Sequence, residues 1–279
     1  MKFAVTIVSP PGYLHSQAFA EVAETLRDGL IELGHEAVLT TEADLPGHQH
    51  LVLGSNLLPQ FSLALAPDAI LYNLEQVEMG SAWFKPELVE LFRRHRVWDY
   101  SPRNAAALAA LGVTVERVLP IGYAPCLTRI RPAMVCDIDV LFIGSLNDRR
   151  KRVLQAMQDT GLRVLAAFGA YGAARDDLIS RARLQLNCHF YEAKVLEMVR
   201  VSYLLANRCA VLSEPGADPA EVAALEGGVA FADYRQLVER ARALLADPTG
   251  RQRMAERGFE LMKARPIAKS LAAALAPTG

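Results

Sequence analysis

Short runs rich in β-branched residues alternate with longer segments of helical periodicity along most of this chain. The run KFAVTIVS precedes the helical pattern SQAFAEVAETLRDGLIEL, and DAILYNL precedes KPELVELFRRH. In the second half, DVLFIGS precedes RRKRVLQAMQ. Strands that alternate with helices of this length form parallel sheets whose crossover helices cover both faces. The sequence therefore predicts an α/β fold.

The length of the chain and a proline-rich break predict two domains. The 279 residues, of which 52% are hydrophobic and 22% charged, are enough for two cores of ordinary size. The segment near 119–137 is rich in proline and has no clear period, which is typical of a linker. We expect Rossmann-like domains at 1–122 and 123–279. The amphipathic helices predicted after residue 231 fall within the second range, and packing against either domain stays open.

The net charge, the N-terminal segment and the cysteines indicate which partners and which cellular compartment to expect. The net charge of −1 provides no basic field for nucleic acid. The first apolar run is too short for a signal peptide, and no run approaches the roughly 18–20 apolar residues of a membrane span. We therefore expect a cytoplasmic protein with no nucleic-acid partner. The four cysteines lack CxxC spacing and are predicted to be buried free thiols: Cys126, Cys136, Cys188 and Cys209.

A basic turn follows the strand predicted at 139–144. The next helix is expected to begin with Asn147 or Asp148 as its N-cap, which places the run RRKR in its first turn. Positive charges there oppose the helix dipole. A phosphate group would bind the free amides and the guanidinium groups together. The pattern therefore favours a phosphate site, and a solvated basic turn is the alternative.

The stretch 186–214, LNCHFYEAKVLEMVRVSYLLANRCAVLSE, places polar residues where a strand gives way to an apolar helix. Asn187 and His189 are expected at the carboxyl end of the strand, where parallel sheets bind ligands. Glu197 and Arg200 are spaced to share one helix face. A buried carboxylate needs partners. Glu197 is therefore predicted either to pair with Arg200 or to accept hydrogen bonds from paired hydroxyls, such as those of a ribose.

Ordered motifs along nearly the whole chain resemble a known family. They include SPPGYLHSQAF, ILYNLEQ, VWDYSPRN, PIGYAP, DIDVLFIGSLNDRRKRVL and LEMVRVSYLLANRCAVLSE. Together they resemble the GT-B glycosyltransferases of the "glycosyl transferases group 1" kind, in a subfamily of bacteria and some large viruses. The resemblance implies two Rossmann-like domains facing across a cleft. The second would hold a nucleoside-diphosphate sugar, and the first an acceptor.

The resemblance also assigns roles at the donor site. Glu197 matches the glutamate that binds the ribose hydroxyls in related enzymes. Only four residues separate it from Glu192, against seven in the family, so Glu192 does not simply inherit the role of the first glutamate. Arg149 and Arg152 would bind the diphosphate. The other donor-site residues are Gly144 and Ser145, whose turn would let amides approach the diphosphate, together with His189, Tyr191 and Arg200.

The first domain supplies candidates for acid–base chemistry on the acceptor. His15, in the loop after the first strand, is a candidate base or acceptor-positioning residue. Glu75 and Gln76, at the tip of ILYNLEQ, compete with it for that role. Glu192 is the remaining catalytic candidate. Asp99 and Tyr100 are interpreted as residues that brace the cleft.

Two further patterns argue against other chemistries. Asp137 and Asp139 form a DxD motif, but it stands at the amino end of its predicted strand, so we interpret it as strand-entry capping and expect no metal site. FGAYGAA contains Gly169 and Gly172 without a full GxGxxG motif, which disfavours a dinucleotide-dependent oxidoreductase.

The sequence therefore predicts a metal-independent glycosyltransferase that uses no cofactor. Its partners would be a nucleotide-sugar donor and an acceptor that is a glycan, a protein or a small molecule. A sugar-nucleotide epimerase of the same fold and a non-catalytic nucleotide-sugar-binding subunit stay open as alternatives. The donor sugar and base, the acceptor and the anomeric outcome are not specified by the sequence.

Overall fold

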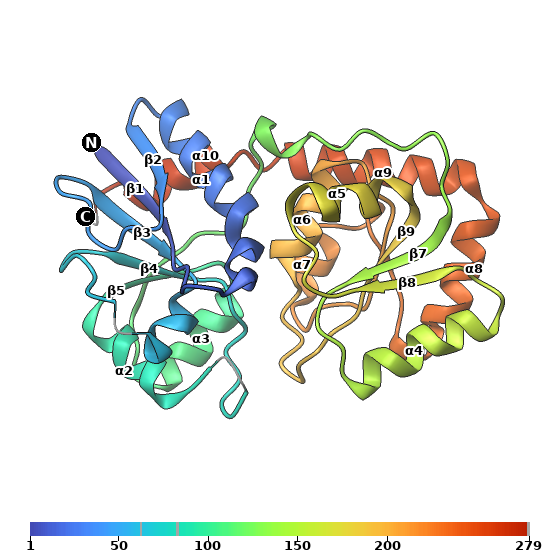
Figure 1. Ribbon diagram of the computed structural model, residues 1–279, viewed down its shortest axis with the longest axis horizontal. Coiled ribbons are helices and arrows are strands. Elements are labelled where there is room, and N and C mark those ends of the chain that lie inside the picture. Colours follow the sequence, from blue (N-terminus) through green and yellow to red (C-terminus); the bar gives the residue numbers. More distant parts are fainter. Residues whose placement is uncertain (62, 82–83, 278–279) are drawn as a thin grey trace. The chain divides into compact units, whose positions relative to one another are not determined.

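The computed structural model describes residues 1–61, 63–81 and 84–277, and its contacts divide the chain into two compact units. The first unit comprises Met1–Cys126 and the segment that begins at Arg265, and the second comprises Leu127–Ala264. Each unit contains one parallel sheet with helices packed against it (Figure 1). The predicted α/β class is confirmed. Within the described ranges, no helix combines the length and the apolar character needed to cross a membrane.

The first unit contains a six-stranded sheet in the order β2-β1-β3-β4-β5-β6. Every strand pair in it is parallel. Its strands are β1 (Lys2–Ile7), β2 (Glu36–Thr40), β3 (Gln49–Leu53), β4 (Ile70–Asn73), β5 (Arg96–Asp99) and β6 (Val115–Val118). Its helices are α1 (Ala20–Glu32), α2 (Pro86–Arg94), α3 (Pro102–Ala110) and α10 (Ile267–Leu275), with 3-10 turns at Leu14–Phe19, Ser55–Gln60 and Pro125–Leu127.

Local sequence signals explain where these elements begin and end. All four residues of β4 are buried, as expected for a central strand covered on both faces. Helix α3 begins after Ser101, whose hydroxyl accepts a hydrogen bond from the Asn104 amide, and Pro102 occupies its first position. The turn after α1 uses Gly34 at φ 81°, a conformation that glycine adopts without strain.

The last helix belongs to the first unit, which differs from the expected division at residues 122 and 123. A Cβ atom on Gly29 of α1 would lie 2.6 Å from the Ile267 side chain, so α1 and α10 are in close contact. The Tyr123 and Arg265 backbones are also hydrogen-bonded at 2.8 Å. The expected bounds placed the helices after residue 231 in the second domain, with packing against either domain left open, and α10 packs on α1.

The second unit contains a five-stranded parallel sheet in the order β11-β10-β9-β7-β8. Its strands are β7 (Ile138–Ile143), β8 (Val164–Ala167), β9 (Ala182–Asn187), β10 (Val211–Ser213) and β11 (Ala230–Phe231). Its helices are α4 (Asp148–Asp159), α5 (Gly172–Arg181), α6 (Met198–Ala206), α7 (Pro219–Ala223), α8 (Leu237–Ala246) and α9 (Pro248–Lys263), with a 3-10 turn at Tyr234–Gln236. Helices α4, α8 and α9 contribute to a core formed with strands β7, β9 and β10.

The DxD motif lies at the amino end of β7, where the sequence places it. Asp139 accepts hydrogen bonds from the backbone and guanidinium of Arg163 at 2.8–3.0 Å. Asp137 pairs with Arg181 at 2.6 Å. The four cysteines are free, as predicted, but only Cys188 is buried and the other three are half-buried.

Candidate functional site

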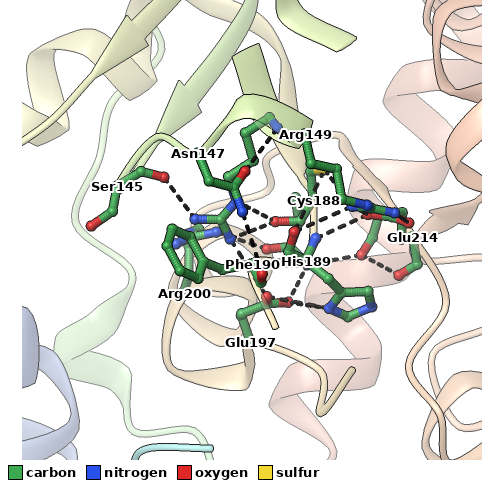
Figure 2. A network of polar contacts seen from close by, with 12 residues as sticks. Ser145, Asn147, Arg149, Cys188, His189, Phe190, Glu197, Arg200 and Glu214 are labelled. Carbon is green, nitrogen blue, oxygen red and sulfur yellow. Dashed lines mark hydrogen bonds and ion pairs between the residues drawn. The ribbon is translucent and has the colours of Figure 1, made fainter. Parts of the chain in front are cut away.

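The carboxyl ends of β7, β9 and β10 and the first turns of α4 and α6 carry one continuous network of polar side chains (Figure 2). Parallel strands end at the same edge of their sheet, so these loops are brought together by the topology alone. All of the network lies within the second unit.

Glu197 lies at the centre of this network. It is the N-cap residue of α6, and its side chain is 14% exposed. Its carboxylate accepts a hydrogen bond from the Asn187 amide at 2.9 Å and is paired with the His189 ring at 3.1 Å. The guanidinium of Arg150 lies 3.7 Å away. Burial by itself would raise the pKa of Glu197, but the hydrogen bond and charge of His189 outweigh it and lower the pKa to about 2.

The alternative of a direct Glu197–Arg200 ion pair is wrong. Arg200 donates to the Asn187 side-chain oxygen at 2.8 Å and acts on Glu197 only through its charge. The reason is local, because α6 begins at Met198 and Glu197 stands outside its first turn. The Glu197 side chain therefore points to the end of β9 rather than along the helix face that carries Arg200.

The partners of His189 favour its doubly protonated form. Its ring nitrogens lie 3.2 Å from the Glu197 carboxylate and 3.0 Å from the Pro215 carbonyl oxygen, and both oxygens can only accept hydrogen bonds. The residue is 1% exposed. Burial lowers the pKa of His189, but the Glu197 hydrogen bond raises it, and the net direction is upward. The imidazolium thus links α6 to the loop after β10.

Arg149 is held by a carboxylate that the sequence analysis did not assign to the site. Both of its terminal nitrogens donate to Glu214, one of them at 2.6 Å, and Glu214 also accepts from the His189 amide at 3.0 Å. The guanidinium stacks over the Tyr234 ring, 4.0 Å from its centre. The only sequence signal for Glu214 is its position directly after the apolar strand CAVLS, and Tyr234 has none.

Some side chains of the basic turn are buried and others are exposed. Helix α4 begins as predicted, with Asn147 accepting from the Arg150 amide at 2.9 Å. Arg150 is 3% exposed and donates to the carbonyls of Ser145 and Cys188, each at 2.8 Å. Burial and the nearby Arg200 lower the pKa of Arg150 to about 10, so it stays charged at neutral pH. Arg152 is exposed. The predicted diphosphate role of Arg149 and Arg152 stays a prediction.

The turn at Gly144 and Ser145 lies against Arg200. Gly144 has φ 146°, and a Cβ atom there would lie 2.8 Å from Nη2 of Arg200. Within the described ranges, Asn187 is the sole hydrogen-bond acceptor for the Arg200 guanidinium. The remaining guanidinium hydrogens of Arg200 therefore lie at a backbone turn that can approach a ligand closely.

The loop between β9 and α6 carries two other predicted residues, Tyr191 and Glu192. Glu192 is exposed, and the ring of Tyr191 makes an edge contact with Phe190 at 4.9 Å. The structure therefore does not bring Glu192 to Glu197. Its catalytic role stays a prediction.

A second polar cluster lies at the carboxyl edge of the first sheet. Asn73, at the end of β4, donates to Asp99, at the end of β5, at 2.6 Å. Burial raises the pKa of Asp99 to about 7, although the hydrogen bond from Asn73 lowers it. Burial also raises the pKa of Glu75 to about 7. His15 makes an edge contact with Tyr13, whose pKa is raised by burial and by the charge of Glu75.

No protein-family model matches the chain, and no curated protein matches its sequence. Solved structures match it over nearly its whole length. AviGT4, a glycosyltransferase of avilamycin A biosynthesis, is 17% identical with a TM-score of 0.57, covering 98% of this chain and 96% of that chain. HepE of Anabaena, solved with UDP-glucose, is 12% identical with a TM-score of 0.58, covering 98% and 99%.

The glucosyltransferase BGT of phage T4, solved with UDP and Mn²⁺, is 12% identical with a TM-score of 0.59, covering 99% of this chain and 100% of that chain. All three have sequence identities at which similarity indicates a shared fold. The chain therefore has the two-unit α/β fold of these glycosyltransferases, the GT-B architecture predicted from its sequence.

Proposed function

We propose that this protein is a glycosyltransferase that moves a sugar from a nucleoside-diphosphate sugar to an acceptor hydroxyl. The observation that carries the proposal is the charge of the network in the second unit. Among the described residues, it joins four cations, Arg149, Arg150, Arg200 and the imidazolium of His189, with the two carboxylates of Glu197 and Glu214. Four positive charges minus two negative ones leave a net charge of two positive. The diphosphate of a nucleoside-diphosphate sugar carries two negative charges, and largely buried charge requires such compensation.

Arg200 is the residue best placed to bind the diphosphate. Its Nη2 lies at the Gly144–Ser145 turn, where the lack of a side chain on Gly144 lets a phosphate approach the backbone. The terminal nitrogens of Arg149 are already bound by Glu214. We therefore assign the direct diphosphate contact to Arg200, and we expect Arg149 to contribute mainly through its charge.

Glu197 is proposed to bind the ribose hydroxyls of the donor. Its pKa of about 2 keeps it ionised at neutral pH, and its side chain retains some exposure to solvent. Its protein partners use only part of the accepting capacity of two carboxylate oxygens. A ribose with two adjacent hydroxyls could therefore donate to the capacity that is left.

The reaction is proposed to need neither a cofactor nor a metal ion. Arg200 and the cations that surround it would stabilise the charge that develops on the leaving diphosphate. Within the described ranges, no group of three or more metal-binding side chains gathers, and the DxD carboxylates are paired with arginines. Because BGT of phage T4 was solved with Mn²⁺, chelation is a necessary experiment.

Calorimetry with UDP-glucose, UDP and uridine tests the donor site, because HepE and BGT of phage T4 were solved with UDP-glucose or UDP. Replacing Arg200 by alanine should weaken UDP binding by about 10- to 150-fold, the equivalent of ~1.5–3 kcal/mol for a charged hydrogen bond. Arg253→Ala, at an exposed position of α9, is the matched control and should bind UDP like the wild type. Equal losses for uridine and UDP would contradict the assignment.

Incubation with glucose-labelled UDP-glucose then tests the transfer itself. Label should appear in a glycosylated acceptor or in free glucose, and EDTA should leave the rate unchanged. An isomerised donor would show an epimerase instead. Binding without any turnover would show a nucleotide-sugar-binding subunit. Loss of activity in EDTA that Mn²⁺ restores would refute metal independence.

A further inference from the structure

The ring of His189, buried within the network of the second unit, contacts acceptors on two different elements. Its Nδ1 lies 3.2 Å from Oε1 of Glu197, at the start of α6 (Figure 2). Its Nε2 lies 3.0 Å from the carbonyl oxygen of Pro215, in the loop after β10. Each neutral tautomer has one ring nitrogen that carries a lone pair in place of a hydrogen. Loss of one proton therefore breaks one of the two contacts.

The carboxylate of Glu197 is held by one contact that cannot titrate and one that can. Among the described residues, Asn187 and His189 are the two whose side chains lie within hydrogen-bonding distance of it. Asn187 donates at 2.9 Å, is fully buried and is itself held by Arg200 at 2.8 Å. Its amide is neutral at every pH of interest, so this contact does not change. The contact with His189 is at full strength only while the ring is charged.

The other charged or titratable groups that face His189 do not change their charge between pH 6 and pH 8.5. Glu214 accepts from the His189 amide at 3.0 Å, and Arg149 donates to the His189 carbonyl oxygen at 3.2 Å. Burial raises the pKa of Glu214, but the hydrogen bond from Arg149 helps to lower it, and the net direction is downward. Burial lowers the pKa of Arg150 to about 10 and raises that of Cys188 to about 12. His189 is thus the group of the described network that titrates in this range.

We propose that His189 is a positioning residue of the ribose site, whose protonated ring orients the Glu197 carboxylate toward the ribose hydroxyls and so makes donor binding depend on pH. This inference rests on the proposed function, in which Glu197 binds the ribose. The residue is 1% exposed, so it acts on the donor through Glu197 and not by direct contact.

The direction of the pH dependence follows from the contacts of the ring. Burial lowers the pKa of His189, but the hydrogen bond to Glu197 outweighs burial, and the pKa is raised above 6.5. The charged form is therefore present at pH 6 and is lost as the pH rises through the folded value. Donor affinity should accordingly be highest near pH 6 and should fall toward pH 8.5.

Calorimetric titration with UDP-glucose from pH 6 to pH 8.5 is the first test. UDP-glucose is preferred to UDP, because a terminal phosphate loses its second proton at about pH 6 and would add its own pH dependence. The wild-type dissociation constant should rise by about tenfold, since a hydrogen bond to a charged group is weakened. His189→Gln does not titrate and should bind equally at every pH. His48→Gln, which changes a histidine of the first unit, is the matched control and should keep the wild-type behaviour. A wild-type dissociation constant that stays constant would overturn the inference.

A donor without the ribose hydroxyls, 2′,3′-dideoxy-UDP-glucose, separates positioning of Glu197 from a general loss of positive charge. The analogue should bind more weakly than UDP-glucose at pH 6, and its dissociation constant should rise by a smaller factor up to pH 8.5. An equal factor for both donors would mean that His189 acts through its charge alone, which contradicts a positioning role.

Titration of His189 in wild-type protein labelled with ¹⁵N-histidine tests the same coupling without a variant that could fail to fold. Proton binding and donor binding are linked. If protonation strengthens UDP-glucose binding about tenfold, bound UDP-glucose must lower the proton dissociation constant of His189 by the same factor. A ring that is neutral at pH 6, or whose titration UDP-glucose leaves unchanged, would overturn the inference. Failure of UDP-glucose to bind at any pH would instead refute the proposed function, so the two failures are distinguishable.

Discussion

Replacing Glu197 by glutamine should destabilise the second unit in a pH-dependent way. Its carboxylate accepts from Asn187 and pairs with the imidazolium of His189, so an amide nitrogen would face a donor in either orientation. A pKa lowered from 4.5 to about 2 corresponds to about 3 kcal/mol of stabilisation by the ionised form. Because the folded pKa is the lower one, this stabilisation is present above pH 4.5 and is lost as the pH falls through 2.

Urea denaturation of the wild type and Glu197→Gln between pH 7 and pH 3 measures this effect. The pH-dependent part of the difference in unfolding free energy should be about 3 kcal/mol at pH 7 and about 1 kcal/mol at pH 3. Glu239→Gln, at an exposed position of α8, should change the free energy by no more than about 0.5 kcal/mol. A difference that stays constant over this range would refute the argument that Glu197 is ionised and paired in the folded state.

Three further predictions concern the same network. The raised pKa of His189 means that its ion pair stabilises fully below pH 6.5 and is lost as the pH rises through the folded value, so unfolding free energies from pH 6 to 9 should fall more for the wild type than for His189→Gln. Arg149→Ala removes the ion-pair partner of Glu214, whose side chain is 5% exposed. Thermal denaturation should therefore show a loss of about 3–5 kcal/mol in the free energy of unfolding, whereas Arg152→Ala should change it by less than about 0.5 kcal/mol. Gly144→Ala and Gly161→Ala both strain a positive φ by about 1–3 kcal/mol, but only the first would displace the adjacent guanidinium, so only the first should weaken UDP binding in calorimetry, by about tenfold or more.

The arrangement of strands and crossover helices could be predicted from the sequence because it depends on local periodicity. Apolar runs such as ILYN become central strands, buried on both faces, and Asn147 caps α4 where the pattern predicts it. The packing of α10 on α1 of the first unit could not be predicted from the sequence. An amphipathic helix specifies that one face must be buried, but the contact between Gly29 and Ile267 that selects α1 as its neighbour is tertiary.

The position of the site was predictable, but its pairings were not. Asn187, His189 and Glu197 are brought together because parallel strands end at one edge. The partners of Arg149 come from the loop after β10 and from Tyr234, which are 65 and 85 residues distant along the chain. Spacing within one helix cannot show such contacts.

The basic turn illustrates why spacing alone does not distinguish the cations. Arg149 and Arg152 are one turn apart, so the sequence treats them as equivalent. Side chains on a helix lean toward its N-terminus, which here lies at the strand tips. From the first turn, Arg149 therefore reaches Glu214, whereas Arg152 starts one turn further away and stays exposed. Arg200 begins from α6, a helix whose own first turn lies at the same edge, and its guanidinium reaches the Gly144 turn. The cation proposed to contact a phosphate is thus selected by the direction of side chains from two helices rather than by the number of arginines in one.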